Sequence, residues 1–525
     1  MGKTFVAIIL SILFVQCNSV QHHNAHLNDM IAVNKLQKDV DFAYSKLKQL
    51  HPQLYWYISK EKLDYKIDSL KATITQPMTS FDFYKKIGPV LYSIRQGHFF
   101  LYPQMKMFSK QENKLLTKKG MGPLSQFELE CFEDKLYVVK NKSKFKSIQP
   151  GAEIITINGK KVNDMLEEYK HWFTSDGYNT TLKKNFLGKR FSTFYSFDNG
   201  IHDSLQYEFK TSDSLKLITV SRKKMDSTAT DKKSSDKAVA TISKADKKAA
   251  AKALRKKNRI YGYNELTKTY QRNFKFLESD STVAVMKIRG FSNGSYWKFY
   301  DQCFKKMKDR KCKALILDLR DNGGGRLSEI NDLYSYLADT TYVFLKPSQV
   351  TSKTSLFHAE YFKGGGIIGK TVKLIFSPLY YSYIFFKVHK GTDGNYYYYS
   401  NTKPVKKDEN AFKGKLYVLI NGGSFSASSI ISSNLKGSKR ATFVGEETGG
   451  AYNGCVAGQM PLIKMPNSKI VMRVGLVAVK PFYSTDVEGR GIFPDQAISP
   501  TLEDRVKNND PEMNWILEDI KKLKK

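Results

Sequence analysis

Cysteine is scarce in this chain, with five residues in a length of 525. Cys17 stands alone near the N-terminus. The other four show neither a CxxC motif nor the spacing of a metal site; they are Cys131, Cys303, Cys312 and Cys455. The sequence therefore excludes a disulfide scaffold and implies no metal. Buried free thiols are the favoured interpretation of the four, although one disulfide in an oxidising compartment is compatible with them.

The apolar run at the N-terminus is short. MGKTFVAIILSILFVQC holds eleven mainly apolar residues from Phe5 to Val15, too few to span a bilayer. We interpret residues 1–17 as a signal peptide whose FVQC end resembles a lipobox, which predicts that Cys17 becomes the lipid-bearing first residue of the mature chain. Gln16 replaces the small residue usual before such a cysteine, so plain secretion is the alternative. The first reading predicts a cell-envelope protein, on the periplasmic side or as an outer-membrane lipoprotein, and the alternative predicts a secreted protein.

Acidic residues are few relative to basic ones, 50 against 85, which gives a formal net charge of +35. Such a charge invites a nucleic-acid interpretation, but the basic residues are spread over the whole chain and no nucleic-acid motif occurs. An exported protein would rarely meet DNA. Weak attraction to anionic lipid or envelope polysaccharide is the functional interpretation that remains.

The length predicts two or three domains with a sizeable core. Residues 18–120 alternate helical periods with breaks, and residues 121–222 alternate strands with turns. The predicted catalytic core spans residues 259–505 and a C-terminal helix spans 506–525. The histidines near the start form a polar tether more readily than a weak metal site; they are His22, His23 and His26.

Two segments are compositionally unusual. Residues 223–258 consist mostly of Lys, Ala, Ser and Asp and cannot bury a core, which predicts a disordered or loosely helical insertion without chemistry. Residues 340–403 are rich in aromatics, as in SPLYYSYIFFKVH and NYYYYSN, interleaved with lysines. Lining a peptide cleft and resting on a membrane are possible roles, but aromatic strands packed on the core are the expected structure.

The chemistry of the chain is concentrated at two strand-glycine-helix junctions. KLYVLINGGSFSASSIISSN runs from Lys415 to Asn434 and places four serines where a helix must begin. A helix N-terminus offers unpaired N–H groups and partial positive charge, which stabilise an oxyanion beside a first-turn side chain. The second junction, from Lys313 to Leu337, carries Gly323, Gly324 and Gly325, which let main-chain N–H groups approach a ligand. A tight structural turn is the alternative for this triplet.

Several segments together resemble the C-terminal processing (tail-specific) serine peptidases, in the tricorn-like branch of Bacteroidetes-type bacteria. The segments are DLRDNGGG at 318–325, NGGSFSASS at 421–429, VGEETGG at 444–450 and EGRGIFPDQAI at 488–498. In order and spacing they cover roughly residues 281–501. The resemblance implies an α/β fold with a ClpP/crotonase-like ββα catalytic core, an N-terminal helical domain and a PDZ-like β module.

The resemblance carries the nucleophile onto Ser426, the middle serine of SFSAS. It implies an oxyanion hole formed by the N–H groups of Ala427 and Gly324, with Ser424 and Ser428 structural. A register slip of two residues would exchange the roles of Ser424 and Ser426. The N-cap hydroxyl is the ordinary role for a serine before a helix.

The base implied by the tricorn-like branch is a histidine, which falls on His98 in SIRQGHFFLYP. The tail-cleaving branch uses a lysine where this chain has Ala451, so a Ser-Lys dyad is not expected. His98 lies at a helix-to-strand corner, and neutral imidazole can take the proton of Ser426. This chain departs from relatives at Gln96, where an acid is common, and at Gly97.

An acid should orient the histidine, and Glu488 is the position that best matches the family. Asp486, Glu446 and Glu447 are alternatives. Each of the four is individually also consistent with a solvated loop carboxylate.

KSIQPGAEIITINGKKVNDMLEEY, from Lys146 to Tyr169, resembles the core of a PDZ module. Such a module captures extended peptide by strand addition. The alternative is a β subdomain that binds nothing.

These observations predict a serine endopeptidase that hydrolyses extended or unfolded polypeptides in the cell envelope through a Ser-His(-Glu) mechanism, without a metal or organic cofactor. Its expected partners are a polypeptide substrate and, through Cys17, a membrane; no nucleic acid is expected. A non-catalytic carrier of apolar ligands and a peptide-binding scaffold are the alternatives on the same fold.

Overall fold

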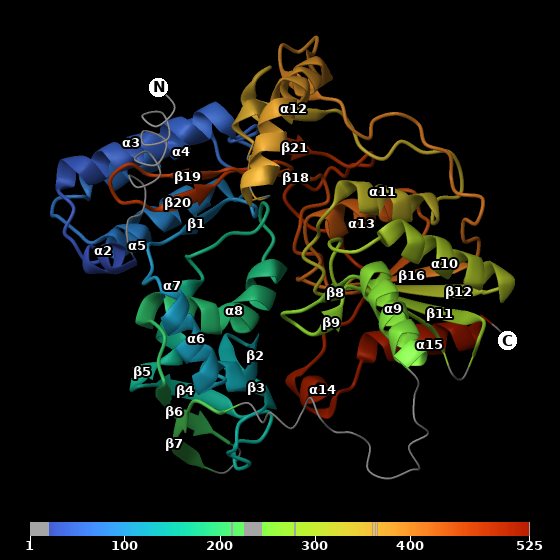
Figure 1. The fold of residues 1–525 in the computed structure, drawn as a ribbon, viewed down its shortest axis with the longest axis horizontal. Coiled ribbons are helices and arrows are strands. Elements are labelled where there is room, and N and C mark those ends of the chain that lie inside the picture. Colours follow the sequence, from blue (N-terminus) through green and yellow to red (C-terminus); the bar gives the residue numbers. More distant parts are fainter. Residues whose placement is uncertain are drawn as a thin grey trace.

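A computed structural model of the protein describes residues 20–211, 214–224, 244–277, 280–359, 361–362, 364 and 366–523 (Figure 1). The predicted signal segment and Cys17 lie outside these residues, as do residues 225–243 of the Lys/Ala-rich segment. No helix in the described part of the chain is long and apolar enough to cross a membrane.

The catalytic region is built on a six-stranded sheet with the order β10-β11-β12-β16-β17-β22. All neighbouring pairs are parallel except β10 and β11. The inner strands are buried on both faces, which explains their nearly continuous apolar sequences. The strands are β10 (Arg272–Phe276), β11 (Val283–Ile288), β12 (Ala314–Asp318), β16 (Lys415–Ile420), β17 (Thr442–Gly445) and β22 (Gln496–Ala497).

Helices cover this sheet on both faces, which confirms the predicted α/β class (Figure 1). One face carries α10 (Tyr296–Asp309), α11 (Leu327–Ser335) and α13 (Ala427–Gly437). The other face packs on the C-terminal helix α15 (Pro511–Lys522) through Ile516 and Ile520. Parallel strands place their carboxyl ends on one edge, where the loops after β12 and β16 meet.

The N-terminal region is helical and is joined to the catalytic region by a small sheet. Strand β1 (Phe100–Tyr102) pairs with β20 (Val471–Arg473), which pairs with β19 (Leu462–Lys464). This pairing joins two segments that are 373 residues apart in sequence, because Phe100 lies opposite Arg473. The helices are α2 (Val20–Ala25), α3 (Val33–Leu50), α4 (Lys60–Ala72), α5 (Ser80–Leu91) and η1 (Tyr92–Ile94).

An antiparallel sheet, ordered β2-β3-β4-β6-β7, forms the second region, and helices α7 and α8 pack on it. That this region resembles a PDZ module and binds peptide stays a prediction. The elements are α6 (Lys110–Lys119), η2 (Leu124–Gln126), β2 (Phe127–Phe132), β3 (Lys135–Asn141), β4 (Glu153–Ile157), β5 (Lys160–Lys161), α7 (Val162–Tyr169), α8 (Thr181–Asn199), β6 (Ser204–Lys210) and β7 (Leu215–Ser221).

The aromatic-rich insertion differs from the expected strands in its central part. NYYYYSN does form a strand, β15, but SPLYYSYIFFK lies in the helix α12 (Gly366–Lys387). The insertion joins a five-stranded sheet ordered β14-β15-β13-β21-β18. Its remaining elements are β13 (Ser348–Val350), η4 (Ser355–His358), β14 (Val388–Lys390), β15 (Tyr396–Tyr398), β21 (Val477–Val479) and β18 (Cys455–Ala457).

The Lys/Ala-rich segment, expected to be disordered or loosely helical, is helical where the structure describes it. Residues 244–258 belong to the helix α9 (Lys244–Tyr261), which packs against α10 where the rings of Tyr261 and Phe299 meet edge-on with centroids 5.1 Å apart. Alanine and lysine are strong helix formers, and this one apolar contact fixes the helix end. The remaining elements are β8 (Tyr263–Asn264), β9 (Thr269–Tyr270) and α14 (Leu502–Lys507).

Candidate active site

Ser426 lies at the turn between β16 and α13, where it is the residue before the first helical position. Its main chain has φ 61° and ψ −124°, a conformation that L-residues rarely adopt. Strain of this kind costs about 1–3 kcal/mol and persists where the surrounding structure enforces it. The Ser426 hydroxyl does not cap α13. The turn thus holds this side chain out for another partner.

That partner is His98, whose Nε2 lies 2.8 Å from Ser426 Oγ. His98 sits between η1 and β1, and its ring stacks on Phe425 with centroids 4.6 Å apart. Its carbonyl oxygen accepts a hydrogen bond of 3.1 Å from Arg473 Nε, beside the β1–β20 pairing. Sheet pairing therefore brings together a histidine and a serine that are 328 residues apart.

The environment of His98 keeps its imidazole neutral. Burial, and secondarily the positive charge of Arg473, lowers the pKa of His98 to about 3. Only 5% of the residue is exposed. A neutral imidazole whose Nε2 faces a hydroxyl can accept the hydroxyl proton, so the pair has the geometry of a nucleophile and a general base.

Of the two predicted oxyanion donors, the N–H of Gly324 already donates a hydrogen bond and that of Ala427 donates none among the described residues. Ala427 begins α13, and no hydrogen bond in the described part of the chain uses its N–H. Gly324 packs closely on Ser426, but its N–H donates to Asn322 Oδ1 at 2.9 Å. The expectation of a free donor at Gly324 is thus not met in this conformation, because an asparagine two residues earlier closes a local turn on it. The neighbouring Gly325 lines the active-site cavity instead.

The fold does not place Glu488 beside His98. Its carboxylate accepts hydrogen bonds from Asn453 Nδ2 at 2.9 Å and from Trp56 Nε1 at 3.2 Å. Glu447 is paired with Arg490 and with the Gly491 N–H. His98 Nδ1 is buried and has no hydrogen-bond partner among the described residues, so none of the four predicted acids orients it in this structure.

Asp176 is an acid near His98 that the sequence did not indicate. It is 1% exposed, and its Oδ1 accepts a 2.7 Å hydrogen bond from the N–H of Gly97, the residue before His98. Its Oδ2 is buried without a partner. Burial raises the pKa of Asp176 to about 7, against hydrogen bonds from the Gly97 and Ala451 main chain that lower it. In sequence, TSDGY looks like an ordinary Asp-Gly turn, so no local signal marked it.

The neighbouring serines have structural surroundings. Ser424 Oγ donates to the Leu319 carbonyl at 2.8 Å and accepts from the Asn421 N–H, which ties the end of β16 to the end of β12. Ser428 is fully buried, and its hydroxyl has no partner among the described residues. Neither serine meets His98, so the exchanged-register alternative does not fit this geometry.

A cavity of about 390 Å³ opens beside Ser426 and His98. Its walls are mainly apolar and come from β18, β21 and the α12 helix; they include Leu345, Tyr380, Ile384, Cys455, Ala457, Val477 and Val479. The described residues contain no group of three or more His, Cys, Asp or Glu side chains arranged to hold a metal ion. The cavity can therefore receive an apolar side chain next to the nucleophile.

Comparison with known structures shows the same fold. Mature CPAF superposes with a TM-score of 0.54 at 14% identity, covering 91% of this chain and 95% of that one. Mature CPAF complexed with lactacystin gives 0.54 at 13% identity, over 94% and 98% of the two chains. A serine-to-alanine mutant of CPAF gives 0.56 at 13% identity, over 91% and 95%. No curated protein sequence matches this chain.

A comparison with protein families gives the closer assignment. The sequence model of Peptidase family S41 matches residues 282–498, a span that contains both glycine-rich junctions and Ser426. Serine peptidase chemistry, predicted from the junctions and their resemblance, is thereby confirmed at the level of the family, whereas the tricorn-like branch stays a prediction. Residues 282–498 therefore match peptidase family S41, which supports the resemblance to the C-terminal processing serine peptidases.

Proposed function

We propose that this protein is an endopeptidase that cleaves extended or unfolded polypeptides, with Ser426 as nucleophile and His98 as general base. The observation that carries the proposal is the 2.8 Å contact between His98 Nε2 and Ser426 Oγ. The apolar cavity beside the pair supports a polypeptide substrate, because it can hold a side chain adjacent to the scissile bond.

In the acylation step, Ser426 Oγ forms a bond to the carbonyl carbon of the substrate while its proton passes to His98 Nε2. The Ala427 N–H and the N-terminal end of α13 stabilise the developing oxyanion, and we assign the second donor to the Gly325 N–H. The imidazolium then gives its proton to the leaving amine as the C–N bond breaks. Water then attacks the acyl carbon while His98 Nε2 takes its proton. As the bond between the acyl carbon and Ser426 Oγ breaks, His98 returns that proton to Oγ, which releases the acid product and restores Ser426.

The imidazolium formed in this step needs a counter-charge, since burial and Arg473 both disfavour it. We propose that Asp176 supplies it. Its carboxylate is held by the Gly97 N–H, one residue from His98, and its free Oδ2 and His98 Nδ1 are both buried without partners. Glu488, which bonds to Asn453 and Trp56, then supports the loop instead of the base.

Asp176→Asn is expected to lower kcat/KM about a hundredfold or more, because the imidazolium loses its compensating charge. In the wild type, kcat/KM should rise with pH through about 7 as Asp176 ionises, whereas the low pKa of His98 gives no transition of its own there. Asp176→Asn should remove that transition. Initial rates on a fluorogenic peptide between pH 5 and 9 measure both effects.

Glu488→Gln is the matched control for Asp176→Asn, since it also neutralises one carboxylate near the site. It should keep the pH transition and most of the rate. A Glu488→Gln enzyme that loses the transition while Asp176→Asn keeps it would return the orienting role to Glu488.

We also propose that the protein works at the surface of an anionic membrane in the cell envelope, anchored by lipid on Cys17. Cell fractionation of wild type and Cys17→Ser tests the anchor. The helix α12 supports the proposal, because six of its exposed apolar residues recur at spacings of three and four and share one face, while Ile367, Leu374 and Phe385 are exposed on its opposite side. The six are Val372 (47% exposed), Ile375 (66%), Phe376 (54%), Leu379 (68%), Tyr383 (55%) and Phe386 (72%).

The same helix places Tyr380 and Ile384 in the active-site cavity, so a membrane that receives its outer face would bring the nucleophile close to substrates at the bilayer surface. Lysines 370, 373 and 387 on α12 complement anionic headgroups.

The double variant Leu379→Asp/Phe386→Asp should abolish co-flotation of residues 18–525 with vesicles of phosphatidylglycerol and phosphatidylcholine. The reason is that it puts two charges into the apolar face that is proposed to enter the bilayer. Leu115→Asp/Leu217→Asp adds the same charges at leucines that are 59% and 66% exposed elsewhere, and should not alter flotation. Equal flotation of both double variants would show that α12 does not bind the bilayer.

A further inference from the structure

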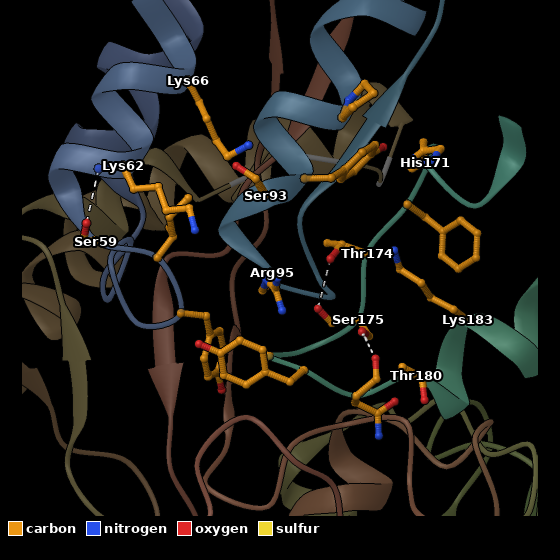
Figure 2. A pocket seen from close by; sticks show the side chains of 18 residues that line it. Ser59, Lys62, Lys66, Ser93, Arg95, His171, Thr174, Ser175, Thr180 and Lys183 are labelled. Carbon is orange, nitrogen blue, oxygen red and sulfur yellow. Dashed lines mark hydrogen bonds between the residues drawn. The ribbon is translucent and has the colours of Figure 1, made fainter. Parts of the chain in front are cut away.

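A second cavity, of about 630 Å³, lies beside residues 171–183, the segment that contains Asp176 (Figure 2). Its walls come from α4, from the turn that precedes His98 and from residues 171–183. Four cationic side chains line it, namely Lys62, Lys66, Arg95 and Lys183, together with His171. None of its eighteen lining residues, all within the described part of the chain, is Asp or Glu.

These cations are not neutralised by the protein. Among the described ion pairs, none joins Lys62, Lys66, Arg95 or Lys183 to a carboxylate. Arg95 lies over the ring of Tyr178 at 4.6 Å, and Lys183 Nζ donates to the Lys170 carbonyl at 3.3 Å. By contrast, Lys85 on α5 binds both Glu168 and Asp198. The cavity is therefore a concentration of positive charge without an internal counter-ion.

Two of the cations oppose each other. Burial lowers the pKa of Lys183, and the positive charge of Arg95 lowers it further. Partly buried cations that face one another are costly unless an anion compensates them. Figure 2 shows Lys183 reaching into the cavity from one side while Lys62 and Lys66 extend from α4 on the other. A bound anion would contact cations from three parts of the chain.

The N-terminal ends of two helices, α4 and α8, add to the positive potential of the cavity. The residue that caps the start of α4, Ser59, lines the cavity, and so does Thr180, the residue before the first turn of α8. Both helices thus begin at the cavity and present the positive ends of their dipoles to it. The helix ends and the four side chains come from independent elements and favour the same sign of ligand charge.

We propose that this cavity binds a small ligand carrying a diphosphate or two phosphoryl groups. Four cations match a ligand of two to four negative charges, whereas one carboxylate would leave most of them unpaired. The volume exceeds that of a single phosphate and excludes a folded partner. The source is either a free phosphorylated molecule or a phospholipid headgroup, which share this chemistry.

Occupation of the cavity also acts on the catalytic base, an inference that rests on the proposed function. Ser175 and Gly177 line the cavity, while Asp176 between them turns its carboxylate to the Gly97 N–H. The Gly177 N–H in turn donates to the Arg95 carbonyl at 2.9 Å. An anion bound by Arg95 and Lys183 would hold both segments of this contact in place, and so hold the Asp176 carboxylate at the Gly97 N–H beside His98.

Isothermal titration calorimetry of residues 18–525, which retain every described residue, tests the binding with inorganic pyrophosphate. We expect one site per chain, an affinity that falls as salt rises, and at least a tenfold loss in Arg95→Gln/Lys183→Gln. Lys110→Gln/Lys114→Gln removes the same charge from α6 and should bind like the wild type. If the first variant does not fold, Lys62→Gln/Lys66→Gln on α4 carries the same test.

Absence of binding, or equal binding by the cavity and α6 variants, would overturn the proposal. Dioctanoyl phosphatidic acid below its micelle concentration, titrated in parallel, separates the two sources: tighter binding than pyrophosphate assigns a lipid headgroup, and weaker binding assigns a free phosphorylated molecule.

The coupling is measured as the rate at which a fluorophosphonate labels Ser426. Pyrophosphate should raise this rate severalfold in the wild type and leave Arg95→Gln/Lys183→Gln unchanged. A labelling rate that does not change when pyrophosphate is added would refute the coupling while leaving the Ser-His assignment intact. No labelling in any sample would refute the assignment instead, and calorimetry would still decide the anion site.

Discussion

Ser426→Ala and His98→Ala should each lower peptide hydrolysis by at least about ten-thousandfold and abolish fluorophosphonate labelling. His98 Nε2 lies 2.8 Å from Ser426 Oγ, so it can take the hydroxyl proton and make the oxygen a nucleophile. Removal of either side chain ends this proton transfer. The double variant should lose little more than either single one, because the two side chains act as a unit. Cleavage of a fluorescently labelled unfolded protein measures the loss.

The control for this experiment is Ser428→Ala, two residues further along α13. Its hydroxyl is buried without a partner among the described residues, so its removal should preserve activity and folding. Ser426→Ala retains the Cβ atom, and its thermal midpoint should match the wild type. Labelling that persists in Ser426→Ala would refute Ser426 as nucleophile, and wild-type activity in the absence of His98 would refute the base.

The elements that the sequence predicted best are those whose chemistry is local. The turn before α13 and the glycine triplet after β12 carry their function in consecutive residues, because strand, glycine and helix start must follow each other to present main-chain N–H groups. His98 is different, since it is 328 residues from Ser426. It was found through the resemblance, and what places it, the pairing of β1 with β20, had no visible sequence signal.

The parts that were missed depend on tertiary contacts. Asp176 becomes distinctive only because the fold buries it against the Gly97 N–H, and Glu488 is withdrawn only because Asn453 and Trp56 reach it. The aromatic segment was expected as strands packed on the core, since aromatic residues favour strands. Much of it instead forms the helix α12, which places Tyr380 and Ile384 at the cavity. The expected burial also fails in part, because Phe376, Tyr383 and Phe386 are more than half exposed.

Gly324→Ala should reduce kcat at least about a hundredfold, even though Gly324 bears no reacting atom. A Cβ at this position would lie 2.6 Å from Ser426 Cβ and 2.8 Å from the Ala427 nitrogen, and the main chain has φ +96°. The methyl group must therefore push away the nucleophile and the oxyanion donor together, and no flexible side chain can yield instead. Steady-state kinetics should show kcat falling much more than KM rises.

Gly323→Ala is the matched control, one residue earlier in the same triplet. An added Cβ there meets nothing within 4 Å, and its φ lies outside the region that disfavours side chains. It should therefore keep the wild-type rate and stability, which would separate close approach at Gly324 from a general need for flexible glycines. Equal losses in both variants would show that the triplet serves the turn as a whole. A loss confined to Gly324 would show that van der Waals contact between the loops after β12 and β16 sets the position of Ser426.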